Sequence, residues 1–224
     1  MMNFNEIYNM DCLEGLKLIP EKSIDTVITD LPYGIDYQSR FGKRFEKIAN
    51  DKKPFIDFIK HIPRLLKDTG AVYLFTRWDV QQPVIEEMEE CGMDVKNVII
   101  WDKGNHSAGD LKHSYGFRYE SIVFHSAKDF TFQGKRPIDI IQCMRVSADK
   151  LVHPNEKPIP LLRKLILDST PKNGVVLDAT MGSGTTILAA IAEKRQYIGF
   201  EIDEHYYNVA KRRINETKRQ LTLF

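Results

Sequence analysis

Short apolar runs alternate along this chain with longer stretches of helical periodicity, and this alternation limits the fold more than any other feature. The runs are rich in β-branched residues and have the length of strands. The expected strands are Glu6–Asn9, Thr26–Thr29, Ala71–Phe75, Val95–Trp101, Glu120–His125, Val175–Leu177 and Tyr197–Phe200. The expected helices are Phe55–Leu66, Val80–Cys91, Pro160–Asp168, Thr185–Glu193 and His205–Arg213. This pattern predicts the α/β class, with a doubly wound, mostly parallel sheet and helices on both faces.

The composition restricts the kind of protein further. The 224 residues fit one domain, 1–224, and the hydrophobic content of 42% and charged content of 28% are ordinary for a soluble globular protein. No apolar run approaches the roughly 18 residues of a membrane span, so we expect a cytoplasmic protein without a membrane partner. The net charge is only +1, so any surface that binds nucleic acid must gather its basic residues locally.

The cysteines and histidines do not have the spacing of a metal site. Cys12, Cys91 and Cys143 lie far apart and form no CxxC pair, and the six histidines show no HExxH pattern. We therefore expect neither a bound metal nor a disulfide framework.

The stretch "VVLDATMGSGTT" has the features of a nucleoside-binding loop. A buried strand ends at Asp178, Gly182 and Gly184 follow, and a helix begins near Thr185. Glycines let a ligand approach the backbone closely, and a helix N-terminus offers unpaired N–H groups. Glu201 ends the next strand, 19 residues after Gly182, where a carboxylate can accept hydrogen bonds from ribose hydroxyls. A simple tight turn and a dinucleotide-binding loop remain alternatives, whereas the missing GK[ST] excludes a P-loop.

A second stretch, "TDLPYG", follows the strand that ends near Thr29. Ligands of open α/β sheets bind at the carboxyl ends of strands, so Asp30 and Tyr33 lie where a site is expected. Taken alone, Asp30 could be a turn cap and Tyr33 an ordinary core aromatic.

Together, "DLPYG", "HPNEKP" and "DATMGSGTT" resemble the S-adenosylmethionine-dependent amino-methyltransferases of DNA, and the resemblance covers nearly the whole chain. These enzymes methylate adenine N6 or cytosine N4. The order of the motifs, with "DLPYG" first, is similar to the permuted β group of the family. The resemblance implies a Rossmann-like, seven-stranded sheet. Two departures stand out: Leu31 replaces the usual proline, and Ala179–Thr180 replace the usual Pro-Phe.

The resemblance also implies roles for individual residues. The Asp30 carboxylate and the Leu31 carbonyl would accept hydrogen bonds from the target amine, Pro32 would fix the backbone, and Tyr33 would stack on a base flipped out of the duplex. The residues expected to bind S-adenosylmethionine are Asp11, Lys157, Asp178, Gly182, Ser183, Gly184, Thr185 and Glu201.

Because the motif opens with Asp, adenine N6 is the expected target. The alternatives are cytosine N4, an RNA amine, a protein glutamine, a catalytically silent cofactor- or DNA-binding module, and a dinucleotide oxidoreductase.

Two stretches with weak periodicity are candidates for DNA contacts. The segment Ile35–Lys53 is locally basic, and residues 127–152 form a short insertion where the family carries its target-recognition region. We expect phosphate contacts from Arg40, Lys43, Arg44, Lys135 and Arg136, with Lys47 and Arg145 as further candidates. About 26 residues is short for target recognition, so low sequence specificity or help from a second subunit, as in a homodimer, would follow.

Overall fold

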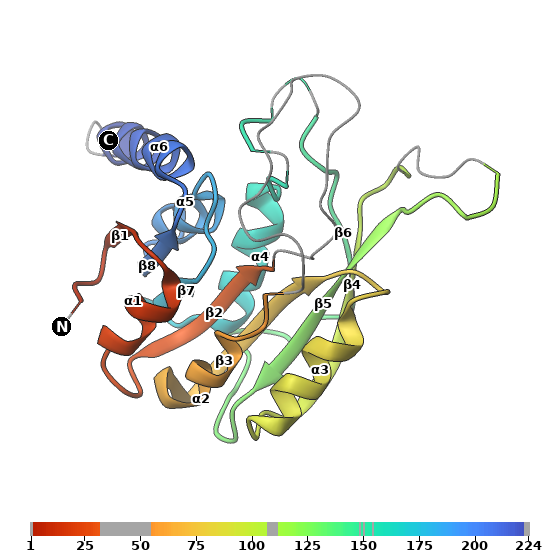
Figure 1. Cartoon of the computed structure of the whole chain (residues 1–224), viewed down its shortest axis with the longest axis horizontal. Helices are drawn as coiled ribbons and strands as arrows, with labels where there is room; N and C mark the ends of the chain where they lie inside the picture. Colours follow the sequence, from red (N-terminus) through yellow and green to blue (C-terminus); the bar gives the residue numbers. More distant parts are fainter. Residues whose placement is uncertain are drawn as a thin grey trace.

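The fold is that of a computed structural model, which describes residues 2–31, 55–106, 112–147, 149, 151–153 and 155–221. The described residues form one eight-stranded sheet with helices on both sides (Figure 1). The strands are β1 Glu6–Asn9, β2 Ile24–Asp30, β3 Leu66–Thr76, β4 Val95–Asp102, β5 Tyr119–Ser126, β6 Ile140–Gln142, β7 Val175–Asp178 and β8 Gln196–Glu201. The helices are α1 Cys12–Leu18, η1 Ile59–His61 (a 3-10 turn), α2 Ile62–Leu65, α3 Gln81–Glu90, α4 Ile159–Ser169, α5 Thr185–Ala192 and α6 Glu204–Leu221.

The strand order is β1-β8-β7-β2-β3-β5-β4-β6. Within the described part of the chain, β5 alone runs against its neighbours, β3 and β4, and every other pair is parallel. The predicted mostly parallel, doubly wound sheet is therefore confirmed. Strands β1, β8, β7 and β2 lie side by side, so their carboxyl ends meet at one edge of the sheet.

Side chains alternate between two cores, one on each face of the sheet, as the period of two along a strand requires. Val72 and Leu74 of β3 pack with α1, α2 and α3, whereas Tyr73 and Phe75 pack with α4, α5 and α6. Because both faces are covered, the central strands β2, β3 and β7 are buried over most of their length.

Several elements differ from the sequence-based expectations. Helix α1 was not expected at all, and α6 continues to Leu221, beyond the expected end at Arg213. The predicted helix Phe55–Leu66 is only η1 and α2, since the chain turns extended at Leu66, which pairs with Ile24 of β2. Strand β3 begins at Leu66, five residues before the expected start at Ala71, and so includes Gly70. Its pairing with β2 shifts register between Ile24 and Thr26, and this shift accommodates the additional residues. Strand β6 is an eighth strand beyond the seven expected, and it is too short to leave a pattern.

None of the helices in the described ranges combines the length and the apolar character needed to cross a membrane.

Candidate active site

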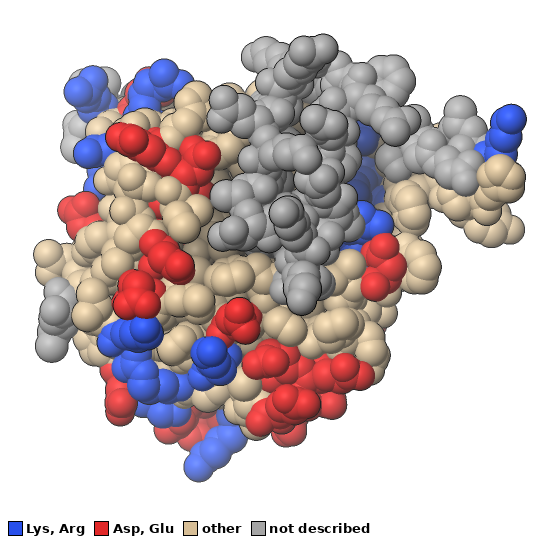
Figure 2. Space-filling view, viewed as in Figure 1, with Lys and Arg blue, Asp and Glu red and all other residues tan. Residues whose placement is uncertain are grey.

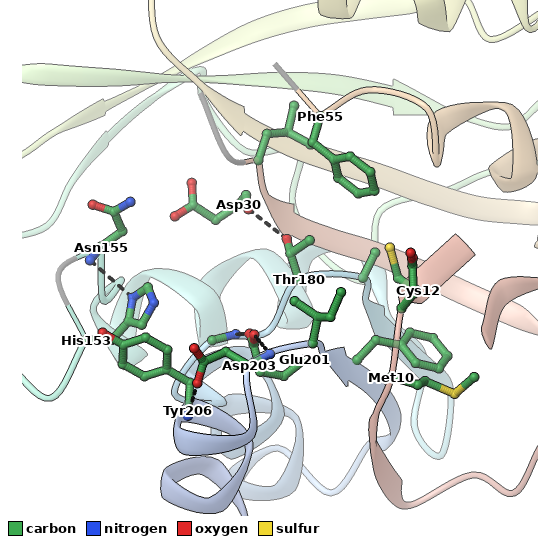
Figure 3. Close-up of a pocket in the computed structure, with 16 residues that line it drawn as sticks. Met10, Cys12, Asp30, Phe55, His153, Asn155, Thr180, Glu201, Asp203 and Tyr206 are labelled. Atoms are coloured by element: carbon green, nitrogen blue, oxygen red, sulfur yellow. Dashed lines mark hydrogen bonds between the residues drawn. The ribbon is translucent and has the colours of Figure 1, made fainter. Parts of the chain in front are cut away.

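A pocket opens at the carboxyl ends of β1, β2, β7 and β8 (Figure 3). Each neighbouring strand contributes its last residues or the loop that follows it. The lining residues are Met10, Asp11, Cys12, Asp30, Leu31, Phe55, His153, Asn155, Ala179, Thr180, Gly182, Phe200, Glu201, Ile202, Asp203 and Tyr206. Acidic groups and apolar surface therefore share one cavity.

Glu201 is held in this pocket by the loop after β7. The backbone N–H of Gly182 donates to Glu201 Oε2 at 2.8 Å, and that of Asp203 donates to Oε1 at 2.8 Å. Burial raises the pKa of Glu201, and these N–H donors oppose the rise. Two backbone donors fix the carboxylate, and each of its oxygens has a further lone pair for a ligand.

The glycines of the loop are required by its backbone. Gly182 and Gly184 have φ values of 50° and 80°, in the left-handed region that favours glycine. A Cβ on Gly184 would also lie 2.9 Å from the Cβ of Ala210, so the loop packs directly against α6.

Of the residues expected to bind the cofactor, the structure brings Asp11, Gly182 and Glu201 to the pocket. Asp11 caps α1 by accepting from the N–H of Leu13 at 2.8 Å. The others lie behind the pocket wall or beside Asp30. They are Lys157, Asp178, Ser183, Gly184 and Thr185.

Asp178 is one of these supporting residues. It is buried, and its Oδ1 accepts from the N–H of Thr180 at 3.1 Å. Burial raises the pKa of Asp178 to about 7, against the effect of its hydrogen bonds with Thr186 and Thr180.

Asp30 lies at the end of β2 and is held through both its backbone and its side chain. Thr180 Oγ1 donates to the Asp30 carbonyl at 2.8 Å (Figure 3). One residue earlier, Thr29 Oγ1 accepts from the N–H of Ala179 at 3.1 Å. Lys157 Nζ donates to Asp30 Oδ2 at 2.5 Å. Both departures from the family pattern, Leu31 and Ala179–Thr180, therefore lie next to Asp30. Thr180 donates to its carbonyl, and Leu31 follows it in the chain and is buried.

Several expected residues lie outside the described residues, and their roles remain predictions. They are Pro32, Tyr33, Arg40, Lys43, Arg44 and Lys47.

The sequence reasoning missed much of the pocket wall, including Asp203, which precedes α6, and Tyr206 in the first turn of α6. His153, noted only as part of "HPNEKP", packs edge-on against Tyr206 with ring centroids 4.3 Å apart and accepts from the N–H of Asn155 at 3.2 Å. Burial lowers the pKa of His153 to about 4, so it is neutral at pH 7. The position of Asp203, two residues after a strand-ending Glu201, was the one available signal.

The expected DNA contacts in the insertion are not brought to the pocket. Lys135 and Arg136 are exposed and precede β6. Nearby, the N–H of Gln133 donates to the carbonyl of Asp168 in the last turn of α4, toward the opposite edge of the sheet. Arg145, by contrast, follows β6.

Comparison with known proteins settles the family. The N6/N4 methyltransferase family model, described as DNA methylase, matches residues 24–212. The chain belongs to this DNA methylase family. The match includes both "DLPYG" and the glycine loop, and Asp30 and Leu31 of the first motif line the same pocket as Gly182 of the second.

Individual relatives agree with the family assignment. The type II methyltransferase M.HinfI of Haemophilus influenzae is 29% identical over 248 aligned positions, which cover 96% of this chain and 69% of the relative. The DNA adenine methyltransferase YhdJ of Escherichia coli strain K12 is 30% identical over 249 aligned positions, covering 93% and 82%.

Solved structures share the fold. The M1.HpyAVI–SAM complex has a TM-score of 0.73 at 26% identity and covers 93% of this chain and 98% of its own. The cytosine-N4-specific PvuII DNA methyltransferase has a TM-score of 0.76 at 18% identity, covering 98% and 93%, a likeness that shows the fold alone. S-adenosylmethionine is the cofactor of the family.

Proposed function

We propose that this DNA methylase transfers a methyl group from S-adenosylmethionine to the exocyclic amine of a flipped base, and that the base is adenine, methylated at N6. The observation that carries the proposal is that Asp30 and Glu201 line the same pocket, one from the end of β2 and the other from the end of β8.

The pocket suits S-adenosylmethionine chemically. Glu201 offers carboxylate oxygens to the ribose hydroxyls, and the Cβ-free Gly182 lets the ligand lie close to the backbone. Phe200 and Ile202 supply apolar surface for a nucleoside base, and Asp11 supplies a second acceptor. When bound, the cofactor supplies a methyl group on a sulfonium, which is already electrophilic.

The protein's own contribution falls on the amine. An exocyclic amine donates its lone pair into the ring and is a weak nucleophile. The Asp30 carboxylate accepts a hydrogen bond from it and favours the positive charge that develops on nitrogen. The Leu31 carbonyl is the expected second acceptor. Thr180 and Lys157 hold Asp30 in place, so the amine is oriented without reorganisation of the site.

The adenine assignment has one specific support. YhdJ, a DNA adenine methyltransferase, is 30% identical and aligned over 93% of this chain. The opening Asp of "DLPYG" is in accord with that choice. Stacking of the flipped base on Tyr33 would offset part of the few kcal/mol that unpairing costs.

The test is mass spectrometry of nucleosides from DNA that has been incubated with the protein and methyl-labelled S-adenosylmethionine. Asp30→Asn removes the charge but keeps the shape. Asp25→Asn is the matched control, because Asp25 also lies on β2 and is ion-paired, with Lys67 at 2.7 Å, but stands at the other end of the strand.

We expect labelled N6-methyladenine that is lost in Asp30→Asn and kept in Asp25→Asn. Labelled N4-methylcytosine would retain the amine chemistry and overturn the choice of base. Cofactor binding by calorimetry without label in any DNA base would overturn the proposed activity.

A further inference from the structure

Glu120 is a largely buried carboxylate that has no part in the chemistry described so far. It lies on β5 opposite Trp101 of β4, and its side chain is 17% exposed. Glu120 Oε1 accepts from Lys103 Nζ at 2.7 Å. Its other oxygen, Oε2, lies 3.3 Å from Lys157 Nζ and has no hydrogen-bond partner among the described residues. One carboxylate therefore faces two ammonium groups.

Lys157 connects Glu120 to the active site. Its side chain is only 8% exposed, and its ammonium lies between Asp30 Oδ2, at 2.5 Å, and Glu120 Oε2. It also lies 5.3 Å from the centre of the Phe75 ring. Burial alone would lower the pKa of Lys157, but Asp30 and Glu120 together raise it, so the ammonium stays charged.

The charges have a consequence for Asp30. Taking Asp30, Lys157 and Glu120 together, two negative charges surround one positive charge, and Lys103 balances the set from the far side of Glu120. If Glu120 were neutral, Asp30 would be the one carboxylate among the described residues paired with the largely desolvated Lys157 ammonium and would experience its full attraction. The amine would then compete with Lys157 for a carboxylate whose charge is already neutralised.

We propose that Glu120 is a positioning residue that acts through Lys157 and keeps the Asp30 carboxylate an effective acceptor for the target amine. This inference rests on the proposed function. Glu120 takes up part of the Lys157 charge and fixes the ammonium from behind. The Asp30 carboxylate therefore keeps more of its negative charge at the position where positive charge develops on the target amine.

The test compares Glu120→Gln with the unchanged enzyme on a methylatable duplex. We expect kcat to fall about tenfold or more, as for the loss of one preorganised electrostatic contribution. The KM and the calorimetric Kd for S-adenosylmethionine should stay within about twofold, because Glu120 does not line the pocket. Glu120→Asp keeps the negative charge but moves it away from Lys157, because the side chain is one methylene shorter. Its kcat should therefore lie between that of Glu120→Gln and that of the unchanged enzyme.

A double-mutant cycle separates this role from a general loss of structure. Lys157→Met removes the connection, so adding Glu120→Gln to it should cost less than about twofold more in kcat. Asp25→Asn controls for the removal of a buried, ion-paired carboxylate elsewhere and should lower the melting temperature without lowering kcat.

Unchanged kcat in Glu120→Gln would overturn the inference and leave the proposed function intact, as would an equal loss with and without Lys157. If Glu120→Gln does not fold, Glu120→Asp alone decides, and full activity in that variant would overturn the inference. An unchanged enzyme that methylates no DNA base would instead overturn the proposed function itself, and this inference with it.

Discussion

Asp178 combines a structural role at the end of β7 with a carboxyl group that burial keeps from ionising readily. Its pKa of about 7 lies above the ordinary value of 3.8, mainly because the side chain is removed from water. The folded protein therefore holds this proton more tightly than the unfolded chain. Its contribution to the free energy of unfolding is present at low pH and is lost as the pH rises through about 4 to about 7.

Asp178→Asn should remove this dependence and keep the acceptor for the N–H of Thr180. At pH 8 the variant should be more stable than the unchanged protein by up to a few kcal/mol, since one pKa unit corresponds to about 1.4 kcal/mol. The difference should shrink toward pH 4. Urea unfolding at both pH values measures it, and parallel pH dependences of the two proteins would show that Asp178 is ionised in the fold.

The residues of the site were predictable to different degrees. Asp30, Gly182 and Glu201 could be predicted because each follows a recognisable strand or lies in a distinctive loop. Lys157 was predicted to bind the cofactor, but its ammonium lies against Asp30, 127 residues earlier in the chain. Which carboxylate a buried lysine contacts depends on the folded arrangement of β2, β5 and the segment before α4, and no local pattern contains that information.

At the scale of elements, the hydrogen bond between Thr180 and the Asp30 carbonyl ties the loop after β7 to the end of β2. The usual proline is absent at Leu31, so this contact supplies part of the local rigidity. Thr180→Val keeps the shape and removes the bond. It should lower stability by about 1 kcal/mol and, by loosening Asp30, lower kcat several-fold.

Ser23→Ala provides the matched control for Thr180→Val. Ser23 Oγ donates to the Pro20 carbonyl at 2.6 Å, just before β2, at the end of the strand away from the pocket. It should show a similar loss in melting temperature with an unchanged kcat. Equal rates in Thr180→Val and the unchanged enzyme, measured by initial-rate methylation assays, would exclude a role of Thr180 in holding Asp30.

The elements that form the site were the most predictable ones. Strands β2, β7 and β8 are buried on both faces and bounded by turns, so their apolar runs are clear in the sequence. Strand β6 has only three residues, and it exists because β4 offers an edge for pairing. The short α2 likewise results from pairing of Leu66 with Ile24, a contact that overrides the helical periodicity before it.

At the scale of the whole molecule, a net charge of +1 leaves no overall attraction to DNA, so local groups must supply it. Figure 2 shows basic and acidic side chains interspersed on one face, with carboxylates gathered over α3, which carries Glu86, Glu87, Glu89 and Glu90. DNA is therefore expected at the edge of the sheet where the pocket opens, and not over α3.

The fold favours Arg145 over Lys135 and Arg136 as the phosphate contact. After β6, the N–H of Cys143 donates to the Asp102 carbonyl at 3.0 Å, which ties this segment to the carboxyl end of β4. The exposed Arg145 thus lies at the edge where the pocket opens, whereas Lys135 and Arg136 precede β6. Arg145→Gln should weaken binding to a random-sequence duplex several-fold and reduce the slope of log K against log salt by about 0.9, the value for one phosphate contact.

Fluorescence anisotropy over a salt series distinguishes these positions. The double variant Lys135→Gln/Arg136→Gln should change the affinity less than Arg145→Gln, although it removes twice the charge. Lys172→Gln/Lys194→Gln, exposed lysines before the amino ends of β7 and β8, controls for net charge alone. If all three variants lose affinity in proportion to the charge removed, the affinity for DNA depends only on the net charge of the protein. If position decides the loss, the edge that holds Asp30 and Glu201 is also the edge that meets the duplex.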